Sequence, residues 1–257
     1  MIPAVVPPLT GLSVLVTRPA PQAESLATTL RAHGAGTVVL PAIEIRPRPV
    51  SPVAEYDLVV FASVNAVEHG ARSIARSATT QVAAIGKATA AALAAIDWPV
   101  HVVPERGFTS ESLLAHPDLT LQAGARAVIV RGSGGRDVLR QTFLSHGLTV
   151  DLLDAYERVL PQIDAPRRDA LEADWIAGDI PVATATSVET LTNLLALLGE
   201  AGRECLQRVP FVVPSPRVRD AAQALGLRGE CLLAGGADDT SIVGALAQWH
   251  TRARTAA

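Results

Sequence analysis

The chain has 257 residues, of which 49% are hydrophobic, and a formal net charge of −3. This length is enough for one large domain or for two ordinary domains, each with its own core. General nucleic-acid binders carry a basic excess and aromatic stacking platforms, so the slight acidic excess and the 4% of aromatic residues argue against that class.

Alternating strands and helices begin close to the start of the chain. An apolar run at residues 14–16 predicts a strand, and a proline-rich turn ends it. Apolar residues then recur at helical spacing from Ala23 to Leu30, and Gly34 supplies the stop. Strand-then-helix patterns return at residues 58–70, 82–93, 128–146, 182–198 and 211–225. The sequence therefore predicts an α/β fold with parallel sheets and helices on both faces.

Part of this pattern is an internal repeat. Residues 15–34 resemble 128–147 at an offset of 113, which takes Arg18 to Arg131 and Gly34 to Gly147. Further similar pairs are 58–70 with 181–193 and, more weakly, 82–95 with 211–224. The period is far above the roughly 20 to 50 residues of a solenoid, so two related domains are expected.

Two proline-rich stretches mark the crossings between these domains. They lie near residues 41–52 and 161–166, where regular structure thins out. Next to them, AIEIRP and AYERVL alternate with period two and are expected to pair as a two-strand linker. Tyr156, one of only two tyrosines, lies in the second of these segments. Its side chain is expected either to face a gap between domains or simply to pack on a neighbour.

Candidate binding residues follow the predicted strands. In an open parallel sheet, ligands bind beyond the carboxyl ends of the strands, near free N–H groups of helices. The loops there offer hydroxyl, amide, guanidinium and bare backbone donors, which suit an anion with several carboxylates or phosphates. The candidate binding residues are Thr17, Arg18, Ser63, Asn65, Gly86, Thr89, Arg131, Gly132, Gly135, Arg136, Thr186, Ser187, Ser215 and Arg217.

Each of these signals also has an ordinary structural explanation. Ser and Thr at such positions are common helix N-caps, and Arg18 or Arg131 alone can be a surface residue. The glycines of RGSGGR make a tight turn, and their spacing is not the dinucleotide fingerprint. The six histidines show no metal-ligand pairing, and His33 and His146 precede helix-ending glycines. We therefore expect neither a metal nor an organic cofactor.

The sequence also predicts where the protein works. Its apolar runs have the length of strands, well short of the roughly 20 residues that span a membrane. The start lacks the basic and apolar regions of a secretory signal. Cys205 and Cys231 are interpreted as thiols of a reducing compartment, with one disulfide as the alternative. A cytoplasmic protein without membrane contact is expected.

An ordered set of segments resembles the uroporphyrinogen-III synthase family. The segments are VLVTRPAPQAESLATTLRAHG, FASVNAV, IGKATAAAL, GFTSESLL, VRGSGGRDVLRQTFLSHGLTV and AYERVLP, and the resemblance runs from about Leu12 to Trp249. It implies two similar α/β/α domains with parallel five-stranded sheets, a two-strand linker and a cleft. It also implies an exchange, in which the first repeat is completed by the last part of the chain. The domains are then residues 1–40 with 162–257, and 48–155, with linker strands at 41–47 and 156–161.

The resemblance also implies an activity. Members of the family close hydroxymethylbilane, a linear tetrapyrrole with eight carboxylates, to uroporphyrinogen III with loss of water and inversion of the terminal ring. Tyr156 matches the tyrosine proposed to assist loss of the hydroxyl and Thr89 a cleft threonine. Ala62 departs from the family's usual Thr, and the prolines around Ser215 put that residue and Arg217 in doubt. Further positions that match recurrent loop residues are Arg18, Ser63, Asn65, Arg131, Arg136 and Ser187.

The expected protein is thus a monomeric lyase of tetrapyrrole and haem biosynthesis, without cofactor, nucleic acid or membrane partner. Catalysis by orientation of the substrate is expected to dominate, because the uncatalysed closure gives the uninverted isomer. Two alternatives remain open from the residues themselves. One is a non-catalytic two-lobed protein that binds or senses a small anion. The other is a sugar-phosphate enzyme that uses RGSGGR as a phosphate loop.

Overall fold

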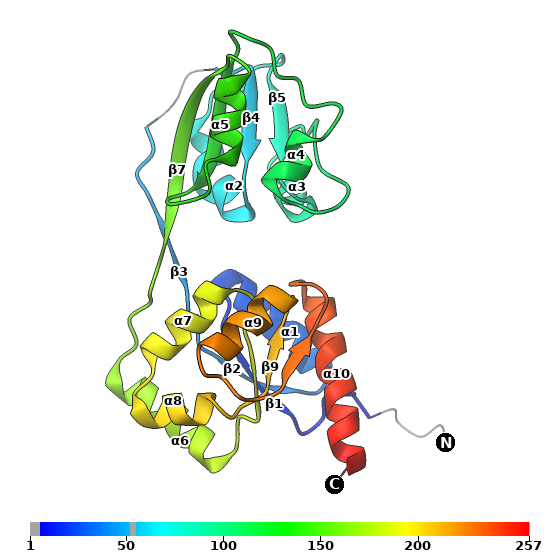
Figure 1. Ribbon diagram of the computed structural model, residues 1–257, viewed down its shortest axis with the longest axis vertical. Coiled ribbons are helices and arrows are strands. Elements are labelled where there is room, and N and C mark those ends of the chain that lie inside the picture. Colours follow the sequence, from blue (N-terminus) through cyan, green and yellow to red (C-terminus); the bar gives the residue numbers. More distant parts are fainter. Residues whose placement is uncertain (1–5, 52–54, 257) are drawn as a thin grey trace. The chain divides into compact units, whose positions relative to one another are not determined.

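The structure is a computed structural model that describes residues 6–51 and 55–256 (Figure 1). The chain forms two compact units. Unit 1 consists of Met1–Glu44 with Val159–Ala257, and unit 2 of Ile45–Arg158. The sequence places the domain boundaries at residues 41–47 and 156–161, and the units divide after residues 44 and 158.

Unit 1 is built on a five-stranded sheet of order β10-β9-β8-β1-β2. All its neighbouring strands pair in parallel. The register aligns Leu15 with Ala183, so the strand of the first repeat pairs with a strand from the last third of the chain. The strands are β1 (Ser13–Val16), β2 (Gly36–Val39), β8 (Val182–Thr184), β9 (Phe211–Val213) and β10 (Cys231–Leu233).

Helices cover both faces of this sheet because successive strand residues point to opposite sides. Leu15 belongs to a core with Trp175 and Phe211, whereas Val14 and Val16 belong to another core. Figure 1 shows α10 and α1 together on one side of the sheet. The helices are α1 (Ala20–Ala32), α6 (Ala165–Ala177), α7 (Val188–Leu197), α8 (Glu200–Leu206), α9 (Pro216–Ala224) and α10 (Asp239–Ala256).

Unit 2 has a second five-stranded sheet, of order β3-β7-β6-β4-β5. Strands β4 to β7 pair in parallel. Alternation again divides the core, with Val59 and Phe61 in one cluster and Leu58 and Val60 in the other. The strands are β3 (Glu44–Pro47), β4 (Leu58–Phe61), β5 (Gln81–Ala84), β6 (Arg126–Gly132) and β7 (Thr149–Val159). The two sheets confirm the predicted α/β class.

The helices of unit 2 are short. They are α2 (Val64–Gly70), the 3-10 helix η1 (Ala71–Ser73), α3 (Lys87–Ala94), α4 (Ser110–Leu114) and α5 (Val138–Ser145). No pattern in the sequence predicts α4. The helix has only five residues and begins at a Thr109 cap, so it offers too few turns for a periodic signal.

The repeated His-Gly pair ends a helix in both units. His33 and His146 are the C-caps of α1 and α5, and each ring nitrogen Nδ1 contacts the carbonyl four residues earlier, at 2.8 and 2.9 Å. Gly34 and Gly147 follow with φ of +91° and +80°, where a side chain would be strained. The shared spacing of the repeat is therefore explained by helix termination in each unit.

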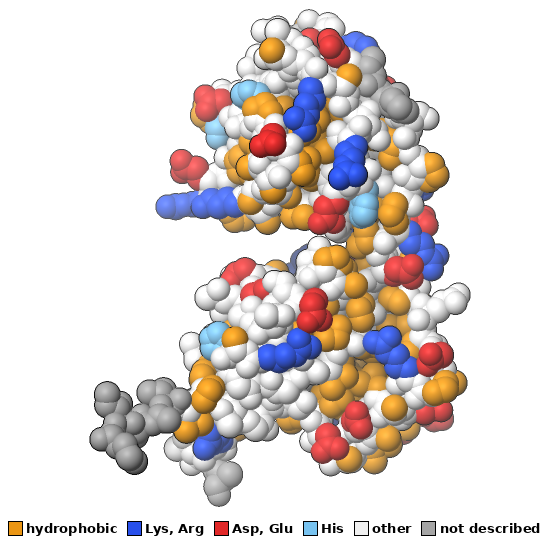
Figure 2. All heavy atoms as spheres, turned by 180° about the vertical axis from the view of Figure 1, so that it is seen from behind, with side chains coloured by type: hydrophobic (Ala, Val, Ile, Leu, Met, Phe, Trp, Pro, Cys, Tyr) orange, Lys and Arg blue, Asp and Glu red, His pale blue; other side chains and the backbone are white. Residues whose placement is uncertain are grey.

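Charged side chains are mixed on the surface. On the face seen in Figure 2, acidic and basic groups lie interspersed among apolar ones, and the coloured residues form no continuous basic stripe. In the stretches 6–51 and 55–256, no helix is both long and apolar enough to cross a membrane. Cys205 and Cys231 are both free thiols.

Candidate functional site

The topology of each sheet marks one place where loops diverge. In unit 2 the chain passes from β4 to β5 on one side, and β6 lies on the other side of β4. In unit 1, β2 and β8 flank β1 in the same way. Ligands of open parallel sheets bind at such switch points, beyond the carboxyl ends of the strands. A ligand is therefore expected at the loops after β4 and β6 and at those after β1 and β8.

Tyr156 lies at the switch point of unit 2. It is only 4% exposed, and its ring packs over the backbone of Gly132, its partner in β6. A methyl group at Gly132 would lie 2.7 Å from the Cζ atom of this ring. The sequence assigns residues 156–161 to a linker strand, but in the structure Tyr156 lies within β7, which starts at Thr149 and pairs with β6. The period-two alternation of the expected linker begins inside β7, so it does not mark where the sheet strand ends.

Ser63 connects this phenol to a helix start. Its Oγ lies 3.0 Å from the Tyr156 hydroxyl and accepts the N–H of Ala66 at 3.1 Å. Ser63 is thus both the N-cap of α2 and the partner of the tyrosine. Asn65 lies in the first turn of the same helix.

The loop after β5 leaves polar groups without protein partners. Gly86 is the N-cap of α3 and has no side chain to bind the first-turn N–H groups. Thr89, in that first turn, is 5% exposed, and its hydroxyl has no hydrogen-bond partner among the described residues. Helix N–H groups and an unpaired hydroxyl of this kind are donors for an anion.

The arginines after β6 are already paired. Arg131 donates to Asp154 at 3.0 Å and to Asp137 at 2.9 Å. Arg136 forks onto both carboxylate oxygens of Glu111, at 2.7 and 3.3 Å, and these hydrogen bonds lower the pKa of Glu111 to about 2. Gly135 lies between the two arginines, where a methyl group would find only ordinary contacts. The guanidinium groups expected to bind a ligand carboxylate hold acidic residues of the chain itself.

The loop after β1 in unit 1 is likewise bonded internally. Thr17 is fully buried and donates to the Thr184 carbonyl of β8 at 2.6 Å. Arg18 is 7% exposed and binds the Asp239 carboxylate and the Ala237 carbonyl at the start of α10. Arg18 is therefore not a surface residue, and its guanidinium is already bound by residues from the far end of the chain.

The loops after β8 and β9 are more open. Ser187 caps α7 by accepting the Thr190 N–H at 3.0 Å. Thr186 beside it and Ser215, the N-cap residue of α9, have side chains without a hydrogen bond to the described residues. Arg217 is exposed and makes no ion pair within residues 6–51 and 55–256. These groups remain available to bind an anion.

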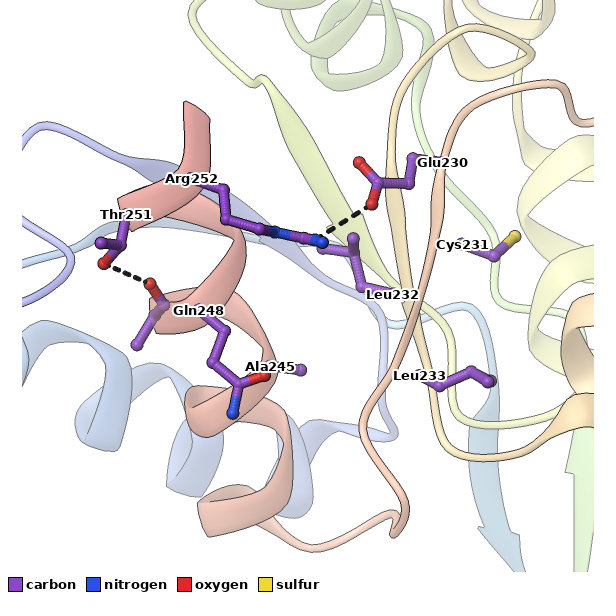
Figure 3. Close-up of a pocket in the computed structure, with 9 residues that line it drawn as sticks. Glu230, Cys231, Leu232, Leu233, Ala245, Gln248, Thr251 and Arg252 are labelled. Atoms are coloured by element: carbon purple, nitrogen blue, oxygen red, sulfur yellow. Dashed lines mark hydrogen bonds and ion pairs between the residues drawn. The ribbon is translucent and has the colours of Figure 1, made fainter. Parts of the chain in front are cut away.

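A cavity of about 790 Å³ lies elsewhere in unit 1 (Figure 3). It is lined by the edge strand β10 and by α10, and the Arg252 guanidinium lies 3.1 Å from Glu230 across it. None of the predicted site residues lines this cavity. Its volume alone does not make it the functional site.

Several residues of these loops are not predicted from the sequence. The acidic partners Asp154, Asp239 and Glu111 carry no local signal, because each lies 23 or more residues from its arginine. Lys87 could have been noticed in the sequence, because it is the only lysine of the chain and directly follows a predicted strand. Over the described parts of the chain, no group of three His, Cys, Asp or Glu residues is placed to hold a metal ion.

Comparisons with known proteins agree with this architecture. The family model described as Uroporphyrinogen-III synthase HemD matches residues 24–232. The uroporphyrinogen-III synthase of Escherichia coli K12 is 30% identical over 249 residues, covering 91% of this chain and all of the relative. That of Salmonella typhimurium LT2 is 32% identical with the same coverage.

Solved structures show the same fold. A mutant uroporphyrinogen III synthase from Thermus thermophilus has a TM-score of 0.59 and 19% identity, covering 96% of this chain and 100% of its own. The enzyme of Helicobacter pylori 26695 has a TM-score of 0.57 and 16% identity, covering 91% and 96%. With the family model spanning most of both units, the chain belongs to the uroporphyrinogen-III synthase family, lyases of porphyrin and haem biosynthesis that cyclise hydroxymethylbilane.

Proposed function

We propose that Tyr156 protonates the leaving hydroxyl of hydroxymethylbilane and that the carboxyl-end loops bind the substrate's carboxylates. The observation that carries the proposal is the 3.0 Å contact between the Tyr156 and Ser63 hydroxyls at the switch point of unit 2. This contact fixes the phenol at the position where ligands bind open parallel sheets. Ser63 also sits at the start of α2, so its orientation is set by the helix.

Carboxylate binding is assigned to the groups that the units leave available. In unit 2 these are the first turn of α3 with Gly86 and Thr89, and in unit 1 they are Thr186, Ser215 and Arg217. Helix N–H groups favour anions through their free donors and partial positive charge. Ser63, Asn65 and Ser187 cap or begin the neighbouring helices and complete the lining of these loops.

The remaining predicted residues support the loops in this proposal. Thr17 and Arg18 fasten the loop after β1, and Arg131 and Arg136 fasten the loop after β6, each through acidic or carbonyl partners. Gly132 gives the Tyr156 ring its space, and Gly135 belongs to the turn that the Arg131 guanidinium binds. These residues then act on the substrate through the shape of the loops.

The first step breaks the C–O bond of the terminal hydroxymethyl group. The bonding electrons leave on oxygen, the Tyr156 hydroxyl supplies a proton so that water departs, and the pyrrole nitrogen stabilises the resulting azafulvene cation. The substituted carbon of the far pyrrole attacks this cation to form a spiro intermediate, which fragments and recloses with that ring inverted. The ring carbon that forms the last bond then loses a proton, which balances the proton donated by Tyr156. The net change is therefore loss of one water.

The phenol is expected to contribute only part of the rate. General-acid help usually supplies a smaller part of a rate enhancement than orientation does, and holding the linear chain in a folded arrangement supplies effective molarity. In this proposal the enzyme uses neither a metal nor an organic cofactor. It works as a monomer in the cytoplasm. Support for the compartment comes from the two free thiols.

The test compares the two tyrosines of the chain. Tyr156→Phe is expected to lower kcat by at most about 10² to 10⁴-fold with KM nearly unchanged, which is the usual range of general-acid help. Tyr56→Phe is the matched control, because Tyr56 is also buried in unit 2 but donates to Asp151 at 2.8 Å. Burial and this hydrogen bond raise the pKa of Tyr56 to about 12.

Both variants are assayed for turnover of hydroxymethylbilane, with separation of the two uroporphyrinogen isomers. Uroporphyrinogen III is expected to remain the enzymatic product of Tyr156→Phe, because orientation of the substrate persists. A kcat for Tyr156→Phe equal to that of Tyr56→Phe contradicts the proposed role of the phenol hydroxyl.

A further inference from the structure

An exposed aromatic ring and the single lysine of the chain lie together beside the loop after β5. Phe108 is 47% exposed, and among the described residues no other Phe, Tyr or Trp side chain is exposed. The Nζ atom of Lys87 lies 6.0 Å from the centre of its ring. Lys87 is the first residue of α3 and is itself exposed. Lysine and exposed aromatic rings are both rare in this chain, and contact with water does not explain why these two lie together.

The backbone holds Phe108 outward at a cost. Gly107 and Phe108 have φ of +83° and +43°, two successive residues in the left-handed region. A bulky residue rarely adopts this conformation, and such strain persists where the surrounding structure enforces it. The ring lies beside Gly86, where a methyl group would make ordinary contacts with the Cβ and ring atoms of Phe108, at 3.4 to 3.6 Å.

The segment is also tied to the loops of the proposed site. Thr109, the residue after Phe108, caps α4 by accepting the N–H of Ser112 at 3.2 Å, and the helix begins at Ser110. Glu111 in that helix is bound by Arg136 from the loop after β6. Phe108 is therefore held between the loop after β5 and the loop after β6.

We propose that Phe108 and Lys87 form a substrate platform, on which one pyrrole ring of hydroxymethylbilane stacks while the Lys87 ammonium binds a carboxylate of that ring. The substrate has four electron-rich rings and eight carboxylates, so each ring pairs a flat face with negative charge. An aromatic face next to a cation matches both features. The inference deepens the proposed function, because it rests on the substrate binding at the carboxyl-end loops of unit 2.

The first test removes and restores each half of the platform. Phe108→Ala and Lys87→Gln are each expected to raise KM about threefold to thirtyfold with kcat nearly unchanged, as for loss of contacts made in ground and transition states alike. Phe108→Tyr and Lys87→Arg keep the ring and the charge and are expected to retain the KM of the unaltered enzyme.

Matched controls come from the same unit. Leu144 is 44% exposed near the end of α5, and Arg72 is exposed in η1, beyond the far end of α2. Leu144→Ala and Arg72→Gln remove similar groups from the opposite end of the sheet and are expected to leave KM unchanged.

A stability measurement separates a binding role from a structural one. Phe108→Gly removes the strain at positive φ, so its melting temperature is expected to equal or exceed that of the unaltered protein while KM rises. An unchanged KM in Phe108→Ala and Lys87→Gln overturns the platform. So does a lower melting temperature in Phe108→Gly, or a raised KM that Phe108→Tyr does not restore. If Tyr156→Phe still lowers kcat in that case, the platform fails while the proposed role of Tyr156 stands.

Discussion

At the scale of single residues, the packing of the Tyr156 ring on Gly132 positions the hydroxyl that is proposed to donate a proton. The phenol ring lies on a backbone position without a side chain, and the ring position sets the 3.0 Å contact to Ser63. The RGSGGR loop therefore needs its first glycine for a reason different from turn formation. From the sequence, the loop is predicted only to be a tight turn that offers hydrogen-bond donors.

Gly132→Ala tests this contact. Its methyl group would overlap the ring at 2.7 to 2.8 Å, so the phenol must move, and kcat is expected to fall about tenfold to a hundredfold because small displacements of a reacting group are costly. Gly135→Ala is the control in the same loop, where the methyl group finds atoms no closer than 3.7 Å. Equal kcat values for the two variants would show that the ring tolerates the methyl group.

Arg18 has a role in stability. Its guanidinium is buried with Asp239, and removing it leaves a carboxylate that is only 24% exposed without its charged partner. Arg18→Ala is expected to lower the free energy of unfolding by about 3 kcal/mol, the lower end for breaking a buried pair. Arg217→Ala, which removes an exposed arginine that makes no ion pair with the described residues, is expected to change it by less than about 0.5 kcal/mol.

Urea denaturation measures both variants. A double-mutant cycle with Asp239→Ala isolates the pair, because the coupling energy is the part that the single variants do not share. A coupling energy near zero would show that Arg18 stabilises unit 1 by contacts other than the ion pair.

At the scale of elements, glycines decide how closely helices approach the sheets. Gly70 ends α2 against β6, and a methyl group there would overlap a Val130 methyl carbon and lie 3.1 Å from the Cβ of Ala155. Gly244 lies inside α10 with no atom within 4 Å of such a methyl group. Two helical glycines thus have opposite environments.

The pair predicts stability changes of opposite sign. Gly70→Ala is expected to lower the free energy of unfolding by about 1–3 kcal/mol through overpacking. Gly244→Ala is expected to raise it by about 0.5–1 kcal/mol, because alanine loses less backbone entropy in a helix. Thermal melting of both variants checks the signs, and stabilisation of the Gly70 variant would contradict the close packing of α2.

At the scale of the whole molecule, each unit has its own core. The four clusters of buried apolar residues each lie entirely within one unit. Unit 2 is one continuous stretch, whereas unit 1 is assembled from the two ends of the chain. Unit 2 is therefore the part that carries all its strands and helices on one segment.

A fragment of residues 45–158 is expected to fold cooperatively on its own. It contains both clusters of unit 2 and the strands β4 to β7. A matched fragment of residues 45–147 lacks β7, which pairs with β6 and supplies Leu153, Ala155 and Tyr156 to the core, and it is expected to remain unfolded. Circular dichroism with urea titration distinguishes them, and a non-cooperative transition in the longer fragment would contradict the independence of unit 2.

The sequence by itself determined the alternation of strands and helices, the helix stops at Gly34 and Gly147, and the loops where donors collect. These signals are local, because the periods of strands and helices and the glycine stops are written in neighbouring residues. Repeated segments also predicted two related sheets. The exchange of partners was implied only by the family resemblance.

Only the tertiary structure decided which groups meet. Arg18 finds Asp239 across 221 residues, Phe108 meets Lys87, and the Tyr156 ring lies on Gly132 because β7 continues through the expected linker. A donor-rich loop looks the same in sequence whether its arginines bind a ligand or an acidic residue of the chain. The difference lies in strand pairing and burial, which bring distant residues together and which no local pattern encodes.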